Sequence, residues 1–296
     1  MSRSSSVRLR LGLFGFVAAI ATLAFGGSAG AQITVGQIAP SLMVVNSGCS
    51  AGSGYNEVQT KVAAGTSYQV PVAGVLTSWS TFPKEGGSLG LGVYRPVAGQ
   101  YLLLAADGRT IAPGAVNTFP VAIPVQAGDL LGLVVPPSAG ASCAFATGDP
   151  ADELIYKSGN APVGSTIAFP PENTEGLVRL NVSATLLPPP TIASISPASG
   201  SIKGVTTTIA GANFAGVSAV SFGGVPAKSF TVDSEGQITA TAPASKKLSK
   251  VPVSVTTVAG VATSATTYAY EGCKVPKLKD RKLKASKKVA RNADCK

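Results

Sequence analysis

Short apolar runs alternate with turn-forming residues along most of the chain. Between residues 32 and 187 such runs cover 68–79, 89–94, 101–105, 120–125, 130–135 and 177–186, and Gly, Pro, Asn or Asp separates each from the next. Runs of this length that are rich in Val, Ile, Thr and aromatic residues predict β-strands. The block is therefore predicted to be an antiparallel β-sandwich, jelly-roll-like in its strand spacing.

Alternation along the first run predicts that four side chains share one face of an unbroken strand: Ala73, Val75, Thr77 and Trp79. Trp79 is predicted to be a core aromatic rather than a platform for stacking a ligand, because large aromatics dominate sandwich cores. Hairpin turns are expected at 107–108 and 128–129, where Asp and Gly stand together.

Residues 191–271 carry a denser pattern of the same kind. After an opening segment, strands are predicted at 206–210, 217–222, 228–232, 237–242, 251–257 and 265–270. Seven short strands in about 80 residues is the count of an immunoglobulin-like sandwich. Three prolines at 188–190 precede this block and predict a stiff linker, since proline has no N–H for a sheet ladder. Two sandwiches, 32–187 and 191–271, are therefore expected.

The second block also carries landmark residues in a fixed order. They are the opening ISPASGS at 195–201, then Gly211, Phe214, the turn Phe222-Gly223-Gly224, and Pro243. This order resembles the IPT/TIG domain family, of the secreted bacterial type, over residues 190–270. The resemblance implies an immunoglobulin-like fold, and members serve in surface receptors, beside secreted polysaccharide-active enzymes, or in DNA-binding transcription factors. A fold-level likeness does not choose among these functions.

Residues 1–31 have the features of a secretory signal peptide. Three arginines precede an apolar stretch at 11–25, and small residues occupy 29–31. The stretch is short for a membrane span, so cleavage is expected to leave Gln32 first, with an uncleaved anchor as the alternative. No later apolar run reaches about 18 residues. The mature protein is therefore expected to be secreted, or held at the cell envelope without a membrane span.

The last segment, 272–296, is strongly basic. It has ten Lys or Arg against two Asp, a net charge of +8, whereas residues 32–272 have eleven basic and twelve acidic groups, a net charge of −1. Its Val-Pro strand and spaced Leu and Ala resemble the first half of a PASTA repeat, which implies a strand and a short helix. The charge indicates either contact with an anionic wall polymer or polysaccharide, or a solvated tail. The candidate contact residues are Lys274, Lys277, Lys279, Arg281, Lys282, Lys284, Lys287, Lys288 and Arg291.

Four cysteines in an exported chain predict disulfides, because the compartment is oxidising. Pairing Cys49 with Cys143 and Cys273 with Cys295 keeps each bond inside one compositional block. Three pairings are formally open, and this one is favoured.

The absence of histidine excludes several kinds of chemistry. It removes the Ser-His-Asp triad, the Cys-His pair and the histidine-containing zinc sites. The pattern G-x-S-x-G occurs at 26–30 and 86–90, but neither match has a histidine partner, and both are interpreted as chance. The protein is therefore expected not to be an enzyme, and no cofactor or metal is expected.

Carboxylates offer the remaining enzymatic route. Asp149, Asp152 and Glu153 cluster in GDPADE, which is either a calcium loop or, with its Gly and Pro, a solvated turn; the turn is favoured. A glycosidase would need two acids opposed across a cleft, with Asp107 and Asp129 as further candidates. A glycosylation sequon at Asn181 falls inside a predicted strand and is given no weight.

The leading hypothesis is a secreted or envelope-associated, non-enzymatic binding or adhesion protein that recognises cell-wall polymer or polysaccharide. A carbohydrate-active enzyme, or its accessory subunit, using carboxylates of the first sandwich is the alternative, and a structural spacer is a third. Nucleic acid is not expected as a partner, because the leader directs the chain out of the cell. The oligomeric state is left open.

Overall fold

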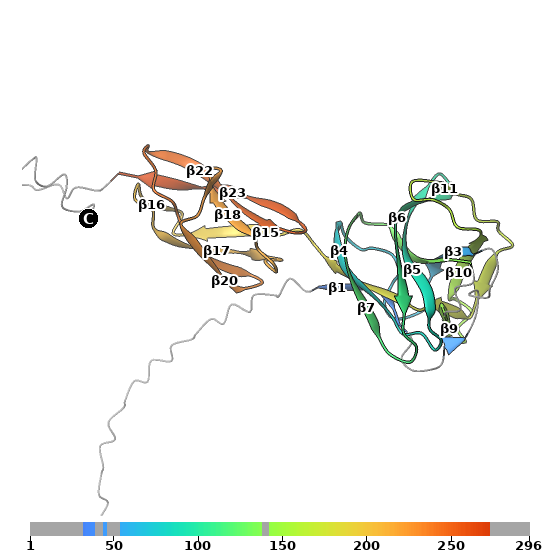
Figure 1. Ribbon diagram of the computed structural model, residues 1–296. Coiled ribbons are helices and arrows are strands. Elements are labelled where there is room, and N and C mark those ends of the chain that lie inside the picture. The colour runs from blue at the N-terminus through green and yellow to red at the C-terminus, as the bar shows by residue number, and fades with distance from the viewer. Residues whose placement is uncertain (1–31, 39–43, 46–53, 138–141, 273–296) are drawn as a thin grey trace, which may run out of the picture.

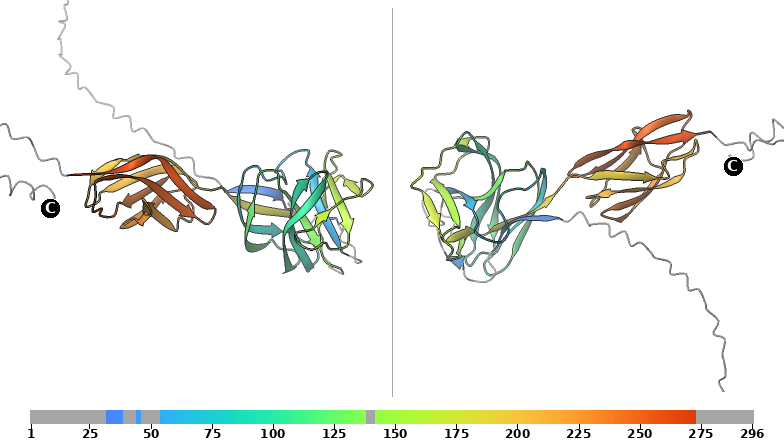
Figure 2. Two further views of the ribbon diagram at one scale, coloured as in Figure 1. Left: turned by 90° about the horizontal axis from the view of Figure 1, so that it is seen from above. Right: turned by 180° about the vertical axis from the view of Figure 1, so that it is seen from behind.

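The computed structural model describes residues 32–38, 44–45, 54–137 and 142–272. All regular structure in these ranges is β-strand, as predicted, and it forms two sandwiches that lie end to end (Figures 1 and 2). Residues 1–31, residues 273–296 and three of the four cysteines fall outside the described residues, so the predictions about a signal peptide, a basic tail and disulfides stay predictions. The described part of the chain contains no helix suited to crossing a membrane.

The N-terminal sandwich is built from strands β1 to β14. They are β1 (Ile33–Gln37), β2 (Val44–Val45), β3 (Tyr55–Lys61), β4 (Gly74–Thr81), β5 (Gly87–Val97), β6 (Gln100–Ile111), β7 (Asn117–Val125), β8 (Leu130–Val135), β9 (Ala144–Ala146), β10 (Glu153–Ser158), β11 (Thr166–Ile167), β12 (Thr174–Gly176), β13 (Val178–Leu180) and β14 (Val182–Leu187). A four-stranded sheet has the order β1-β14-β4-β7, and a seven-stranded sheet has the order β11-β6-β5-β8-β3-β10-β12. A third, small sheet has the order β13-β9-β2.

The main core of this sandwich draws side chains from both large sheets. Leu76 and Trp79 of β4 belong to the same buried cluster as Leu91 of β5 and Leu131 of β8. The prediction of an antiparallel sandwich for this block is confirmed. Trp79 is a fully buried core residue, also as predicted.

Strand β4 contains a bulge that the alternation pattern did not foresee. Its register against β7 shifts between Leu76 and Ser78. Because one extra residue reverses the phase of a strand, Leu76 and Trp79 are both buried, whereas Val75 and Thr77 are only half-buried. The strand is therefore not unbroken, and the four side chains do not share one face.

Two expected hairpin turns are also wrong. Gly108 lies inside the long strand β6, directly opposite Gly90 of β5. Gly128 and Asp129 do form a turn, but it connects β7 with β8, which belong to different sheets. The predicted strand at 177–186 is in fact two strands, β13 and β14, that meet at Asn181.

A second apolar layer covers the outer face of the seven-stranded sheet. Val58 of β3 and Tyr94 of β5 pack there with Ile167 of β11 and the half-buried ring of Phe169. Both faces of β3 are consequently covered, and the four consecutive residues 56–59 are buried.

The C-terminal sandwich is built from strands β15 to β23. They are β15 (Thr191–Ser196), β16 (Ser199–Ser201), β17 (Thr206–Ala212), β18 (Ala219–Phe222), β19 (Val225–Pro226), β20 (Ser229–Ser234), β21 (Gln237–Thr241), β22 (Ser249–Thr257) and β23 (Gly260–Glu271). One sheet has the order β15-β17-β21-β20, and the other has the order β16-β23-β22-β18-β19. β14 ends at Leu187 and β15 begins at Thr191, so the three prolines between them form no strand.

The landmark residues of the second block are scaffold, as predicted. Phe214 and Phe222 are buried between the two sheets. Gly211 allows β15 to approach β17 closely, because a Cβ at this position would lie 1.9 Å from the carbonyl oxygen of Thr191 and would clash with the Phe214 ring.

Truncating Phe214 tests how much this core stabilises the fold. We expect Phe214→Ala to lower the free energy of unfolding of the C-terminal sandwich by about 3–5 kcal/mol, because it leaves a large cavity. The measurement is chemical denaturation of a chain that comprises residues 32–296. Val261→Ala, at an exposed position of β23, is the control and should change stability by no more than about 0.5 kcal/mol. Equal effects of the two variants would contradict this description of the core.

Candidate functional site

The GDPADE loop lies against an arginine from β13. Asp152 lies near the end of this loop, and its Oδ2 lies 2.9 Å from Nε of Arg179. The Asp152 side chain is fully buried and the Arg179 side chain is 8% exposed, so water screens the pair little. A buried pair of this kind is stable only when further hydrogen bonds satisfy both partners.

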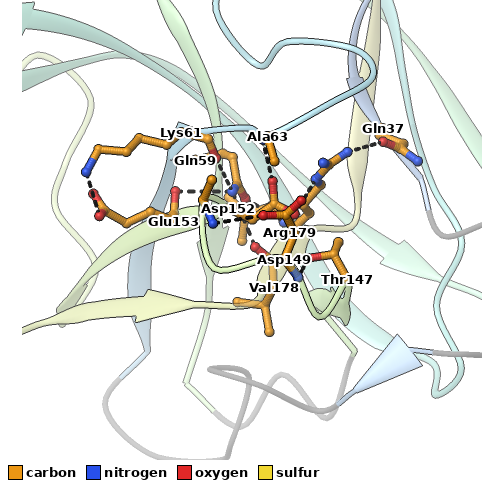
Figure 3. Close-up of polar contacts among 12 residues, drawn as sticks. Gln37, Gln59, Lys61, Ala63, Thr147, Asp149, Asp152, Glu153, Val178 and Arg179 are labelled. Carbon is orange, nitrogen blue, oxygen red and sulfur yellow. Dashed lines mark hydrogen bonds and ion pairs between the residues drawn. The ribbon is translucent and has the colours of Figure 1, made fainter.

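Those further hydrogen bonds are present on both sides of the pair (Figure 3). The backbone N–H of Ala63 donates to Asp152 Oδ1 at 2.8 Å, and Arg179 donates to Oε1 of Gln37 in β1 at 2.8 Å. Burial raises the pKa of Asp152, but hydrogen bonds from Arg179, Thr147 and Ala63 outweigh it and lower the pKa overall. Asp152 is therefore a structural anion that ties the loop to β13 and to the segment after β3, and Arg179 extends the network to β1.

The other acids of the loop point to different partners. Asp149 Oδ1 accepts a hydrogen bond from the N–H of Ala151 at 3.0 Å, as in a turn. Glu153 Oε2 forms an ion pair of 2.8 Å with Nζ of Lys61, and both of these side chains are partly exposed. Among the described residues no three His, Cys, Asp or Glu side chains are grouped so as to hold a metal ion. The hydrogen bond and ion pairs of these three acids therefore support the interpretation of GDPADE as a turn, and in the described part of the chain no such geometry supports a calcium loop.

The remaining candidate carboxylates are also paired. Asp107 accepts hydrogen bonds from Nε1 of Trp79 at 2.6 Å and from Nε of Arg109 at 2.9 Å. Asp129 forms a bidentate pair with Arg95, at 2.7 and 2.9 Å. Four of the five candidate acids are thus neutralised by four different bases.

Glu57 is a buried carboxylate that sequence reasoning missed. It lies in β3 with its side chain enclosed, and neither of its oxygens has a hydrogen-bond partner among the described residues. Burial, and secondarily the charge of Glu175, raises its pKa from 4.5 to about 8. Glu57 is therefore largely protonated at neutral pH, which avoids the cost of burying a charge.

A second polar residue of β3, Gln59, connects three strands. Its Nε2 donates to the carbonyl oxygen of Glu153 at 3.1 Å, and its Oε1 accepts from the N–H of Leu180 at 2.8 Å. The register between β3 and β10 shifts at Glu153 and Leu154, and the Gln59 amide satisfies backbone groups at this bulge.

A small polar cavity lies beside this bulge, and we call it the Tyr101 cavity. Its volume is about 220 Å³, and its lining is mainly polar. The uncharged side chains of Thr60, Ser67, Gln69 and Tyr101 contribute to the lining, together with Leu130. None of the five candidate carboxylates is part of it.

The position of the Tyr101 ring is fixed by an aromatic contact with Phe169. It packs edge-on against Phe169, with ring centroids 5.3 Å apart and an interplanar angle of 90°. Partial burial, and secondarily the charge of Glu153, raises the pKa of its hydroxyl, so the group stays a neutral donor and acceptor. Thr60 Oγ1 donates to the Glu153 carbonyl at 3.1 Å, which orients the adjacent wall.

The other residues that the sequence analysis singled out lie in the core or on a strand, where the structure describes them. Cys143 is buried in the main core, while Cys49, Cys273, Cys295 and the basic residues of the tail lie outside the described residues. The sequon residue Asn181 is buried, and its Nδ2 donates to the carbonyl oxygen of Phe82 at 2.6 Å. Ser88, the central residue of the G-x-S-x-G match, is exposed within β5.

Comparison with protein-family models agrees with the geometry of the C-terminal sandwich. One segment of the chain matches a family model. This segment contains the two facing sheets, the buried phenylalanines and the closely packed Gly211. An IPT/TIG domain is detected at residues 190–270. The resemblance inferred from the landmark residues is confirmed for the IPT/TIG domain, and the PASTA-like tail stays a prediction. No curated protein sequence matches the chain.

Solved structures resemble the chain distantly. The plexin A4 extracellular region is 18% identical over 76% of this chain and 19% of its own, with a TM-score of 0.27. SGBP-B from a xyloglucan utilization locus of Bacteroides uniformis is 17% identical over 69% of this chain and 51% of its own, with a TM-score of 0.27. The chain therefore spans about a fifth of the first protein and about half of the second.

Replacing Asp152 tests the buried ion pair. We expect Asp152→Asn to lower the free energy of unfolding by about 3–5 kcal/mol, because it leaves the Arg179 charge buried without a counterion. Asp149→Asn, in the same loop, keeps its acceptor oxygen and should cost no more than about 0.5 kcal/mol. The measurement is chemical denaturation with and without calcium. A calcium-dependent gain in stability that Asp149→Asn abolishes would restore the calcium-loop hypothesis.

The raised pKa of Glu57 predicts a pH dependence of stability. Between pH 4.5 and about 8 the folded protein keeps a proton on Glu57 that the unfolded chain has lost, so stability falls as the pH rises through this window. The full loss is on the order of 5 kcal/mol, and Glu57→Gln should remove most of it. Denaturation midpoints of both proteins across this range provide the measurement. The exposed Glu172→Gln serves as control, and an unchanged slope in Glu57→Gln would refute the prediction.

Proposed function

We propose that this protein is an exported, non-enzymatic binding protein of the cell envelope, and that its N-terminal sandwich recognises a neutral polysaccharide in the Tyr101 cavity. The observation that carries the proposal is the composition of this cavity. It offers hydroxyl and amide groups and an aromatic ring, and no charged side chain lines it. The IPT/TIG domain acts as scaffold in this proposal.

The state of the carboxylates favours binding over hydrolysis. A glycosidase requires one carboxylic acid and one carboxylate on either side of the bond that it cleaves. In the N-terminal sandwich Asp107, Asp129, Asp152 and Glu153 each engage a separate arginine or lysine. These pairs commit the four acids to structural contacts, and none of the four acids lines the cavity.

The size and polarity of the Tyr101 cavity indicate the kind of ligand. Its volume of about 220 Å³ is smaller than the range of about 300–1,000 Å³ that is typical of sites for drug-sized molecules. A single sugar ring of a longer chain suits such a site, because one ring is small and carries many hydroxyl groups. Tyr101 can contact the apolar face of that ring while Thr60, Ser67 and Gln69 exchange hydrogen bonds with its hydroxyls.

The basic tail has a separate role in the proposal. Its net charge of +8 favours retention on anionic wall polymers, whereas the near-neutral sandwiches add little electrostatic attraction. Retention by the tail should therefore weaken as salt rises, and recognition by the uncharged cavity should not.

A glycan array probed with the mature protein tests the proposal. We expect binding to one class of neutral polysaccharide, weakened at least about tenfold by Tyr101→Ala, as for loss of a central contact residue. Gln69→Ala should also weaken binding, and Gln126→Ala, an exposed glutamine outside the cavity, is the matched control. Removing residues 273–296 should leave the array result unchanged and reduce salt-sensitive retention on isolated cell wall.

Three outcomes would each overturn a different part of the proposal. Binding that is equally sensitive to Gln69→Ala and Gln126→Ala would remove the Tyr101 cavity as the site. Failure to bind any neutral glycan would reject glycan recognition and favour a structural spacer. Equal wall retention with and without the tail would reject tethering by the tail.

A further inference from the structure

Strand β20 forms an open edge of the C-terminal sandwich. It is the outermost strand of its sheet, it pairs only with β21, and all six of its residues are exposed (Figure 1). Phe230 and Val232 are 36% and 39% exposed, although they lie opposite Ala240 and Ile238, which fill the core. The apolar inner face of this sheet therefore continues past the core into solvent.

The facing sheet does not cover these side chains. It ends at β19, which has only two residues, and Val225 of that strand is itself exposed. Proteins usually protect long edge strands with proline, lysine or a cover. The edge strand β7 of the first sandwich contains Pro120 and Pro124, but β20 contains neither proline nor lysine. Its backbone groups and apolar side chains are thus both open to another strand.

We propose that β20 pairs with β20 of a second copy of this chain, in antiparallel orientation about a twofold axis through Thr231. The sequence of the strand is self-complementary in this register. Phe230 of each copy lies opposite Val232 of the other on the inner face, an aromatic and β-branched pair that stabilises sheets. On the outer face Thr231 lies opposite Thr231, and Ser229 opposite Asp233.

Charge favours the same orientation. Lys228 precedes the strand, whereas Asp233 and Glu235 stand at its other end. Antiparallel pairing brings Lys228 of one copy next to the acidic end of the other, and parallel pairing would place like charges together. The bulge between Val232 and Ser234 keeps the new ladder short. The pairing is consequently weak and concentration-dependent, below the contact area of a permanent dimer.

A cysteine at the twofold axis tests both the contact and its register. In an antiparallel pair directly opposed Cα atoms lie about 4.5–5.5 Å apart, within the range of about 4.4–6.8 Å that a disulfide spans. We expect Thr231→Cys to form disulfide-linked dimers at least about tenfold faster than Val261→Cys, an exposed control on β23 that is 62% accessible. Equal rates of cross-linking would overturn the register proposed here.

A charged substitution tests the association without a covalent bond. Sedimentation equilibrium of the mature protein at about 0.15 M salt, where repulsion between the basic tails is screened, should show a monomer and dimer equilibrium. Val232→Lys should weaken it at least about tenfold because each dimer would bury two charges, while Val261→Lys should leave it unchanged. A protein that stays monomeric at millimolar concentration would overturn the proposal, as would equal effects of the two lysine variants.

Discussion

The N-terminal sandwich depends on one constraint, which is that each polar side chain buried in β3 must be hydrogen-bonded inside the protein or lose its charge. β3 lies between β8 and β10, and apolar layers cover both of its faces. Gln59 meets the constraint by bonding backbone groups of β10 and β13 at a bulge. Beside it, the Asp152 and Arg179 pair holds the neighbouring loop and the first strand. The Tyr101 cavity exists where this polar framework meets the outer apolar layer.

Much of the fold was predictable because most strands follow the apolar pattern that burial requires. The strand at 130–135 has the predicted bounds, and the strands of the IPT/TIG domain fall close to their expected places. β3 was missed because its sequence YNEVQTK is polar at three of its four fully buried positions. Periodicity treats such residues as exposed, whereas here hydrogen bonds and protonation make their burial tolerable.

The candidate site was predictable only in part. The sequence showed Asp152 and Glu153 side by side in one acidic loop. It could not show their ion-pair partners, because Arg179 and Lys61 come from strands that are distant in the sequence. Tyr101 lies inside a predicted strand, and the residues next to it in the sequence give no sign of a cavity. The cavity forms because the fold brings Gln69 and Thr60 close to Tyr101. A ligand site built from separate strands leaves no compact motif.

The buried amide of Asn181 constrains how the protein can be produced. Its Nδ2 hydrogen bond to Phe82 and its backbone hydrogen bond to Cys143 lie at the junction of β13 and β14. In a host that attaches glycans to Asn-X-Ser before folding, a sugar on this nitrogen would occupy the interior of the sandwich. Secretion from such a host would yield glycosylated chains unable to close this junction, so a host that leaves the sequon unmodified is required.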